Sequence, residues 1–265
     1  MHGRSRIEIG FVCLVALFGA LAAPATRSAA DEAESERVVE RLEQITFLSH
    51  ILRDLPLRVV AEDLKLSGEQ CRELNRLHHV QDTASHAAIF IGDRRKQKAA
   101  WQQIDADARR GLIAVLSTEQ LVRTHEIFCR LHGPTLLLTV VADELELTGP
   151  QELAVAAVNE LHGRAKWKAS EAVGSLSTNP DDMPEYRRKS LELARKKALL
   201  QLRATELMLE LMVPEQRRKL ESMYGRPLDI VRFFEEEERS YWDLGPDEPP
   251  DDSPSLAAPP IAPRR

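Results

Sequence analysis

Apolar residues recur along most of the chain at the three- and four-residue spacing of an amphipathic helix. Over residues 33–54 they stand at Val38, Leu42, Ile45 and Leu52, and Pro56 follows. The pattern predicts one helix from about 33 to 54, ended by the proline. Because no segment alternates apolar and polar residues as a strand would, the sequence predicts an all-α fold.

Two pairs of long helices are predicted farther along. The first pair covers about 67–116, with Gly92 as the best break, and the second covers about 148–173 and 185–211, separated by the loop GSLSTNPDDMP. Short helices are expected at 57–65 and 136–146. Residues 236–265 start in a glutamate run and hold seven prolines in the last twenty positions, so they are expected to be a disordered tail.

Nearly the same twelve residues occur twice, as VVAEDLKLSGEQ at 59–70 and VVADELELTGPQ at 140–151. Seven positions are identical, which indicates an internal duplication of a helical-hairpin unit. The predicted organisation is therefore two tandem units packed into an elongated helical bundle. Its segments are a leader (1–30), an N-terminal helix (31–55), unit one (56–134), unit two (135–228), and a C-terminal helix end with its tail (229–265).

Four short stretches share an apolar residue, a hydroxyl residue and a glutamine: LSGEQ, LSTEQ, LTGPQ and, with Val213 in place of the hydroxyl, MVPEQ. This order is typical of a capping box, in which the hydroxyl accepts a backbone N–H three residues on and the glutamine reaches back to the cap residue. The leucine before the hydroxyl can pack on the first turn, and proline suits a first helical position. The predicted capping residues are Leu66, Ser67, Gln70, Leu116, Ser117, Gln120, Leu147, Thr148, Gln151, Pro214 and Gln216.

These recurring boxes, together with the export signal described below, resemble the LTxxQ-motif periplasmic family, to which the chaperone Spy and the stress adaptor CpxP belong. The resemblance covers about residues 56–230, in a tandem version with four boxes. It implies an all-helical periplasmic protein that binds other proteins, and relatives of this kind include metal-responsive proteins.

The first thirty residues look like a secretory signal peptide. Arg4 and Arg6 precede the apolar run FVCLVALFGALAA, and Ser28, Ala29 and Ala30 supply the small residues of a cleavage site. The protein is therefore expected to be periplasmic or secreted, without a stable membrane span after cleavage. An uncleaved anchor is the alternative, because the uncharged stretch from 9 to 26 approaches the length that spans a bilayer.

Charge argues against a nucleic-acid partner. The chain of 265 residues carries a net charge of −6, and removing residues 1–30 takes away three arginines and one glutamate, which leaves −8. An acidic exported protein is a poor ligand for a polyanion. Only 5% of residues are aromatic, which also favours helix over sheet.

Two cysteines remain after the leader, Cys71 and Cys129, and an oxidising compartment favours a disulfide between them. A second interpretation involves His125, Cys129 and His132, whose i, i+4, i+7 spacing places them along one side of a helix, where they could bind a soft divalent metal. The competing interpretation of these three residues is partial burial along a helix flank.

Two basic runs, RRKQK (94–98) and YRRKSLELARKK (186–197), fall in the second long helix of each unit. They fit either an anionic partner or the solvated face of an amphipathic helix. The carboxylate pairs Glu62–Asp63 and Asp143–Glu144 recur, but neighbouring residues on a helix do not face each other, so acid–base catalysis is not expected from them. With no recognisable catalytic motif or cofactor loop, the sequence predicts a protein that is not an enzyme and has no cofactor.

Between Leu191 and Met212 the apolar residues spread beyond one narrow stripe, so this helix is expected to be apolar on two sides. One side packs its hairpin, and the other is covered by the duplicate unit, by a second copy in a homodimer, or by a client. The predicted function is chaperone-like binding of unfolded or partly folded envelope proteins, or an adaptor for a membrane sensor. The alternatives are a metal-responsive sensor and, third, an unrecognised enzyme.

Overall fold

The computed structural model describes residues 28–136, 141–174 and 183–241. All of their regular structure is helical, as the sequence predicts, and these ranges contain no strand. The helices are α1 (Ala29–Ile45), α2 (Leu48–Asp54), α3 (Arg58–Asp63), α4 (Gly68–Ile89), α5 (Arg94–Val115), α6 (Thr118–Leu136), α7 (Val141–Glu144), α8 (Gly149–Gly174), α9 (Met183–Glu210), α10 (Pro214–Tyr224) and α11 (Ile230–Tyr241).

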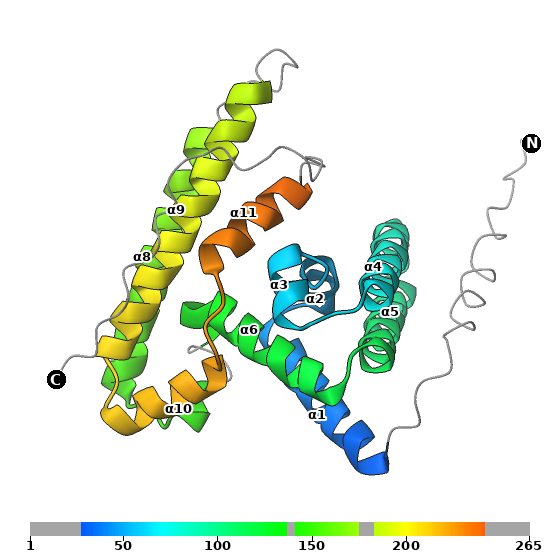
Figure 1. The fold of residues 1–265 in the computed structure, drawn as a ribbon, viewed down its shortest axis with the longest axis horizontal. Helices are drawn as coiled ribbons and strands as arrows, with labels where there is room; N and C mark the ends of the chain where they lie inside the picture. The colour runs from blue at the N-terminus through cyan, green and yellow to red at the C-terminus, as the bar shows by residue number, and fades with distance from the viewer. Residues whose placement is uncertain (1–27, 137–140, 175–182, 242–265) are drawn as a thin grey trace, which may run out of the picture.

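Two antiparallel hairpins, α4–α5 and α8–α9, lie on opposite sides of the molecule (Figure 1). The helices between them are α1, α2, α3, α6 and α11, with α10 below. Helix α6 packs along α1 and also contacts α8, α9 and α10, while α11 contacts both α9 and α3. The central helices therefore join the two hairpins into one body.

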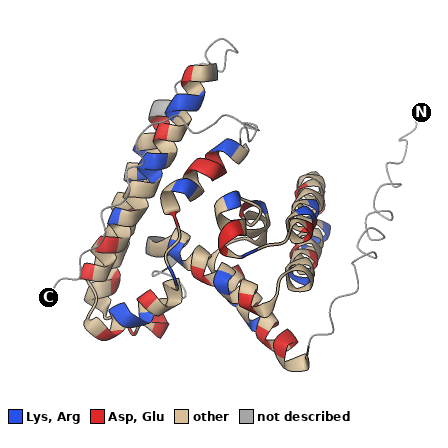
Figure 2. Cartoon of the chain, viewed as in Figure 1, with Lys and Arg blue, Asp and Glu red and all other residues tan. Residues whose placement is uncertain are grey.

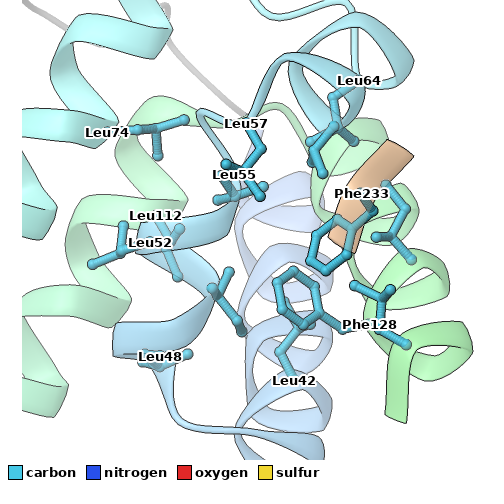
Figure 3. Packing of buried hydrophobic residues seen from close by; sticks show 14 of the residues in the cluster. Leu42, Leu48, Leu52, Leu55, Leu57, Leu64, Leu74, Leu112, Phe128 and Phe233 are labelled. Atoms are coloured by element: carbon cyan, nitrogen blue, oxygen red, sulfur yellow. The ribbon is translucent and has the colours of Figure 1, made fainter. Parts of the chain in front are cut away.

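The larger core lies around α1, α2 and α6 (Figure 3). Leu42, Ile51, Leu52 and Leu55 are fully buried there, and Phe128 of α6 packs beside them. Helix α11, which is last in the described chain, adds Ile230, Phe233 and Phe234 to the same cluster. Residues from both ends of the described chain thus complete one core.

A smaller core belongs mainly to the second half of the chain. It is formed by Val141 of α7, Leu145 just after that helix, Val155 of α8, and Met208 and Met212 near the end of α9, together with Cys129, Leu220 and Tyr224. It lies where α6, α8, α9 and α10 converge.

The two repeated stretches have matching backbones. Lys65 and Glu146, at equivalent positions, both have a φ of 53°, and each is followed by a leucine whose N–H donates to the carbonyl of an alanine five residues earlier. Around these turns the elements follow the same order: α3, α4, α5 and α6 in the first unit, and α7, α8, α9 and α10 in the second.

Two expected boundaries were wrong. The single helix predicted for 33–54 is broken at Thr46, whose backbone is extended, so α1 and α2 are separate helices. The predicted tail also starts too early, because residues 236–241 belong to α11. Glu236 accepts a hydrogen bond from the Val59 backbone N–H at 2.7 Å, and Glu237 pairs with Arg53 at 2.9 Å, so ion pairs and hydrogen bonds hold this segment on the body.

The predictions for the leader as far as residue 27 and for the tail from 242 onwards concern residues outside the described ranges. Ser28, where the expected cleavage region begins, caps α1 by accepting the Asp31 backbone N–H at 3.1 Å. Across the described ranges, every helix is too short or too polar to cross a lipid bilayer.

Candidate functional site

The predicted capping residues form two glutamine-linked corners. In the first unit, Gln70 accepts from the Ser67 backbone N–H and donates to both the Val115 carbonyl and the Gln120 side chain, each at 2.8 Å. Gln120 accepts from the Ser117 backbone N–H at 2.9 Å and donates to the Leu64 carbonyl. Each glutamine therefore caps its own helix and also holds the end of another segment.

The second unit repeats this arrangement. Gln151 donates to the Leu211 carbonyl at 3.0 Å and to the Gln216 side chain at 2.8 Å, and Gln216 donates to the Leu145 carbonyl. One detail differs from the prediction: the Thr148 hydroxyl donates to Gln151 Oε1 at 3.0 Å instead of accepting a backbone N–H. Pro214 occupies the start of α10, and Gln216 reaches back to the Val213 backbone N–H.

The predicted metal-binding set is not assembled. Cys129 Sγ lies 3.6 Å from His125 Nε2, but His132 stacks on the Phe128 ring. The helix rise separates His125 and His132 by about 10 Å along the axis. Burial also raises the pKa of the Cys129 thiol to about 12, so the thiolate ligand is suppressed. The described residues contain no group of three side chains suited to a metal ion.

The predicted disulfide is also absent, since Cys71 and Cys129 are both free thiols. Cys71 lies in the first turn of α4, whereas Cys129 is buried in the smaller core beside Val141 and Met208. Residue count and compartment indicated the pairing, but the helices place the two thiols in different surroundings.

The two basic runs differ in their surroundings. In the run at 186–197, Arg195 pairs with Glu235 at 2.5 Å and Lys197 lies 3.8 Å from Glu238, so the glutamate run of α11 neutralises part of it. The run at 94–98 begins α5, and its four cations are exposed. These two runs therefore need separate explanations.

The carboxylate pair of the first repeat forms ion pairs. Glu62 pairs with Arg58 and Arg232, each at 2.7 Å. Asp63 pairs with Arg123 at 2.6 Å. Burial alone would raise the pKa of Asp63, but the hydrogen bonds from Arg123 and Arg226 outweigh burial and lower it. These carboxylates join α3 to α6 and α11 and stay ionised, which suits a structural role.

Sequence reasoning missed a group of titratable side chains, most of them half-buried, between the two halves. It comprises His50, Arg53 and Asp54 of α2, His132 of α6, His162 and Lys166 of α8, and Glu237 of α11. Burial lowers the pKa of both His132 and His162 to about 4, and the charge of Lys166 adds to both effects. Burial also lowers the pKa of Lys166 and raises that of Glu237.

This group favours neutral imidazoles at neutral pH. The Nε2 atom of His162 is buried without a hydrogen-bond partner, and Lys166 Nζ lies 5.8 Å from the centre of the Phe234 ring. These residues come from four helices far apart in sequence, so no local sequence motif predicts the group. The arrangement makes stability depend on pH, because protonation would place further positive charges beside Lys166 and Arg53.

A shallow groove of about 690 Å³ runs between α1, α2 and α5. Its central cation, Arg109, pairs with Glu43 and lies 3.6 Å from both Glu36 and Glu40. Because Arg109 is paired within the protein, it is not available to an incoming ligand.

The outer face of α8 exposes three large apolar side chains. Leu153, Leu161 and Trp167 are 75, 64 and 66% exposed, while Val155 and Ala169 are buried on the opposite side against α9. Exposed Ala156 and Ala157 lie between the two leucines. We call Leu153, Ala156, Ala157, Leu161 and Trp167 the α8 outer face.

The sequence prediction located surplus apolar area on the neighbouring helix. In the structure the second apolar side of α9 is covered by its own chain, because Ala194 and Ala198 join the larger core with α6 and α11. Leu199 is strongly exposed, while Leu200 and Leu207 are half-buried. The even spread of apolar residues around α8 was the signal that could have indicated the correct helix.

No protein-family model, no curated protein and no solved structure matches the chain.

Proposed function

We propose that this protein is an exported, non-enzymatic binding protein that holds apolar segments of partly folded envelope proteins against the α8 outer face. The observation that carries the proposal is the concentration of three large, strongly exposed apolar side chains on one helix of a projecting hairpin. Exposed apolar area of this kind is costly in water and marks binding surfaces.

The surroundings of this face support a loosely specific partner. Charged residues, including the Glu160–Arg164 ion pair, lie among its apolar side chains and keep the face soluble when it is empty. The face is formed by a single helix without any deep pocket described there, which suits short apolar segments of varied sequence. The resemblance to the LTxxQ family and the predicted export belong to the same proposal.

The test is aggregation of citrate synthase during heat unfolding, followed by light scattering with the protein present and no ATP. We expect near-stoichiometric protein to suppress aggregation, and we expect the triple variant Leu153→Ser, Leu161→Ser, Trp167→Ser to lose most of that suppression. All three side chains are exposed, so the variant should retain the wild-type helix content and melting temperature.

Phe47→Ser is the matched control, because Phe47 is equally exposed but lies between α1 and α2. It should suppress aggregation as the wild type does. The proposal is rejected if the wild type does not suppress aggregation, or if the triple variant suppresses it as well as the wild type does. If sedimentation shows a dimer that the triple variant abolishes, the face is instead an interface between two copies of this chain.

A further inference from the structure

The tip of the α4–α5 hairpin exposes large apolar side chains. Phe90, in the turn after α4, is 85% exposed, and Ile89 beside it is 58% exposed. No described residue covers the Phe90 ring, and the turn 90–93 projects from the end of two 22-residue helices. The tip therefore holds an apolar apex that the fold itself does not use.

Four cations follow this apex directly. Arg94, Arg95, Lys96 and Lys98 are exposed, and none of them has a carboxylate within ion-pair distance among the described residues. The later arginines of the same helix are paired, Arg109 with Glu43 and Arg110 with Asp107. Figure 2 shows basic residues on this hairpin, on the far side of the molecule from α8.

Helix stability does not explain these cations. Arg94, Arg95 and Lys96 occupy the first turn of α5, where the helix dipole disfavours positive charge. The only acid there is Asp93, whose carboxylate is used to cap the Arg95 and Lys96 backbone N–H groups. A cluster of unpaired cations at this position is best explained by a negatively charged partner.

We propose that the α4–α5 tip docks on an anionic lipid surface, a property that goes beyond the proposed function. Phe90 and Ile89 would enter the interface, where aromatic and aliphatic side chains partition, while the four cations would contact lipid headgroups. The chain as a whole has a net charge of −6, so attraction to a negative surface needs a local cluster of cations without ion pairs, which this tip supplies.

The experiment measures partitioning of the whole chain onto phosphatidylcholine vesicles with and without phosphatidylglycerol, at low and high salt. We expect binding only to the vesicles that contain phosphatidylglycerol, and we expect salt to weaken it. Every variant carries the same N-terminus, so any contribution of residues 1–27 is common to all of them. Circular dichroism checks that each variant is folded.

Two tip variants separate charge from apolar contact. Arg94→Gln, Arg95→Gln, Lys96→Gln should weaken partitioning about 100-fold, since each cation near an anionic surface contributes roughly a fivefold effect. Ile89→Ser, Phe90→Ser should weaken it about tenfold or more. The matched control, Arg187→Gln, Arg188→Gln, Lys196→Gln, removes the same charge from exposed positions of α9 and should bind like the wild type.

The proposal is overturned if the wild type does not partition, if it binds neutral vesicles equally well, or if the α9 control loses as much binding as the tip variants. It is also overturned if the tip variants lose suppression of citrate synthase aggregation while vesicle binding is unchanged, because the tip would then be a protein-docking surface. The triple α8 variant should still bind vesicles even where it loses suppression of aggregation, so the two proposals are tested separately.

Discussion

His132 lies where the two halves of the protein meet. Its ring stacks on Phe128 of the larger core, with 6.3 Å between ring centres, and burial together with the charges of His50 and Lys166 lowers its pKa to about 4. The folded state therefore holds this imidazole neutral over a pH range in which an unfolded chain would protonate it.

The first prediction concerns acid stability. The pKa of His132 falls from 6.5 in the unfolded chain to about 4 in the fold. His132 therefore does not lower the free energy of unfolding above pH 6.5, but lowers it progressively as the pH falls towards 4. After allowance for its partial exposure, the loss should be about 2 kcal/mol. Urea unfolding measures this loss. The free energy of unfolding of the wild type should fall on acidification relative to that of His132→Leu, so any advantage of the wild type shrinks or reverses.

His79→Leu serves as the control, because His79 is exposed on α4. Its free energy of unfolding should follow the wild type across the same pH range. Burial raises the pKa of Asp54 and Glu237, which acts in the opposite direction, and comparing variants cancels that contribution. If His132→Leu tracked the wild type at every pH, the imidazole would not be held neutral.

At the scale of helices, the glutamine-linked corners fix how each hairpin leaves the body. Gln70 and Gln120 tie the start of α4 to the end of α5 and the start of α6, and Gln151 and Gln216 do the same for α8, α9 and α10. Their amides are half-buried and pair with carbonyls that the ending helices leave free. The recurring glutamine therefore joins elements in addition to capping them.

The second prediction follows from this double role. Gln70→Ala should lower the free energy of unfolding by about 3 kcal/mol, because it removes the hydrogen bonds of Gln70 to the Ser67 N–H, the Val115 carbonyl and the Gln120 side chain, and leaves the Val115 carbonyl without its glutamine donor. Ser67→Ala loses one capping bond and should cost about 1 kcal/mol.

Urea unfolding measures both changes, and Gln102→Ala, at an exposed position of α5, should lie within about 0.5 kcal/mol of the wild type. If Gln70→Ala were no less stable than Ser67→Ala, the hydrogen bonds of Gln70 to Val115 and Gln120 would contribute nothing to stability beyond the cap of α4.

Helix boundaries were predictable where a residue type enforces them. Gly92 lies in the break between α4 and α5, because the conformational freedom of glycine disfavours a helix interior, and Pro214 begins α10, because its fixed φ suits a first helical position. The break at Thr46 has no such residue, so tertiary packing of α2 decides it. The glutamate run of α11 looked like a solvated tail because its partners, Arg53, Arg195 and Lys197, are distant in sequence.

The candidate sites were less predictable than the helices, because spacing within one helix does not determine what the neighbouring helices cover. His125, Cys129 and His132 have a plausible spacing, but burial of the thiol and stacking of His132 on Phe128 prevent a shared ligand set. The apolar surplus was assigned to α9, but α6 and α11 cover the second side of that helix. It was overlooked on α8, whose outer side is exposed among the described residues.

At the scale of the whole molecule, α11 closes the structure. It contacts α9 of the second unit and α3 of the first. Two polar contacts reach the first unit, from Arg232 to Glu62 and from Glu236 to the Val59 backbone, and a third reaches α2, from Glu237 to Arg53. The repeated units therefore depend on a segment that belongs to neither of them.

The third prediction in this series is a truncation. Ending the chain at residue 229 removes Ile230, Phe233 and Phe234 from the larger core, and burial of three such side chains contributes roughly 5 kcal/mol, comparable to the whole stability of a typical domain. The shortened protein should be largely unfolded or expanded, as measured by circular dichroism and sedimentation.

Ending the chain at residue 241 instead keeps α11 and should preserve the wild-type melting temperature. If the chain ending at 229 melted cooperatively at the wild-type temperature, α11 would be an accessory to the fold and not part of its core.

The position of α11 also sets the order in which the fold can be completed. A chain emerges from the ribosome N-terminus first, so α1, α2 and α6 are made long before Phe233 and Phe234 are available to pack against them. The largest core stays open until more than 230 residues have been synthesised. We therefore expect nascent chains of this protein to complete this core only after α11 has been synthesised.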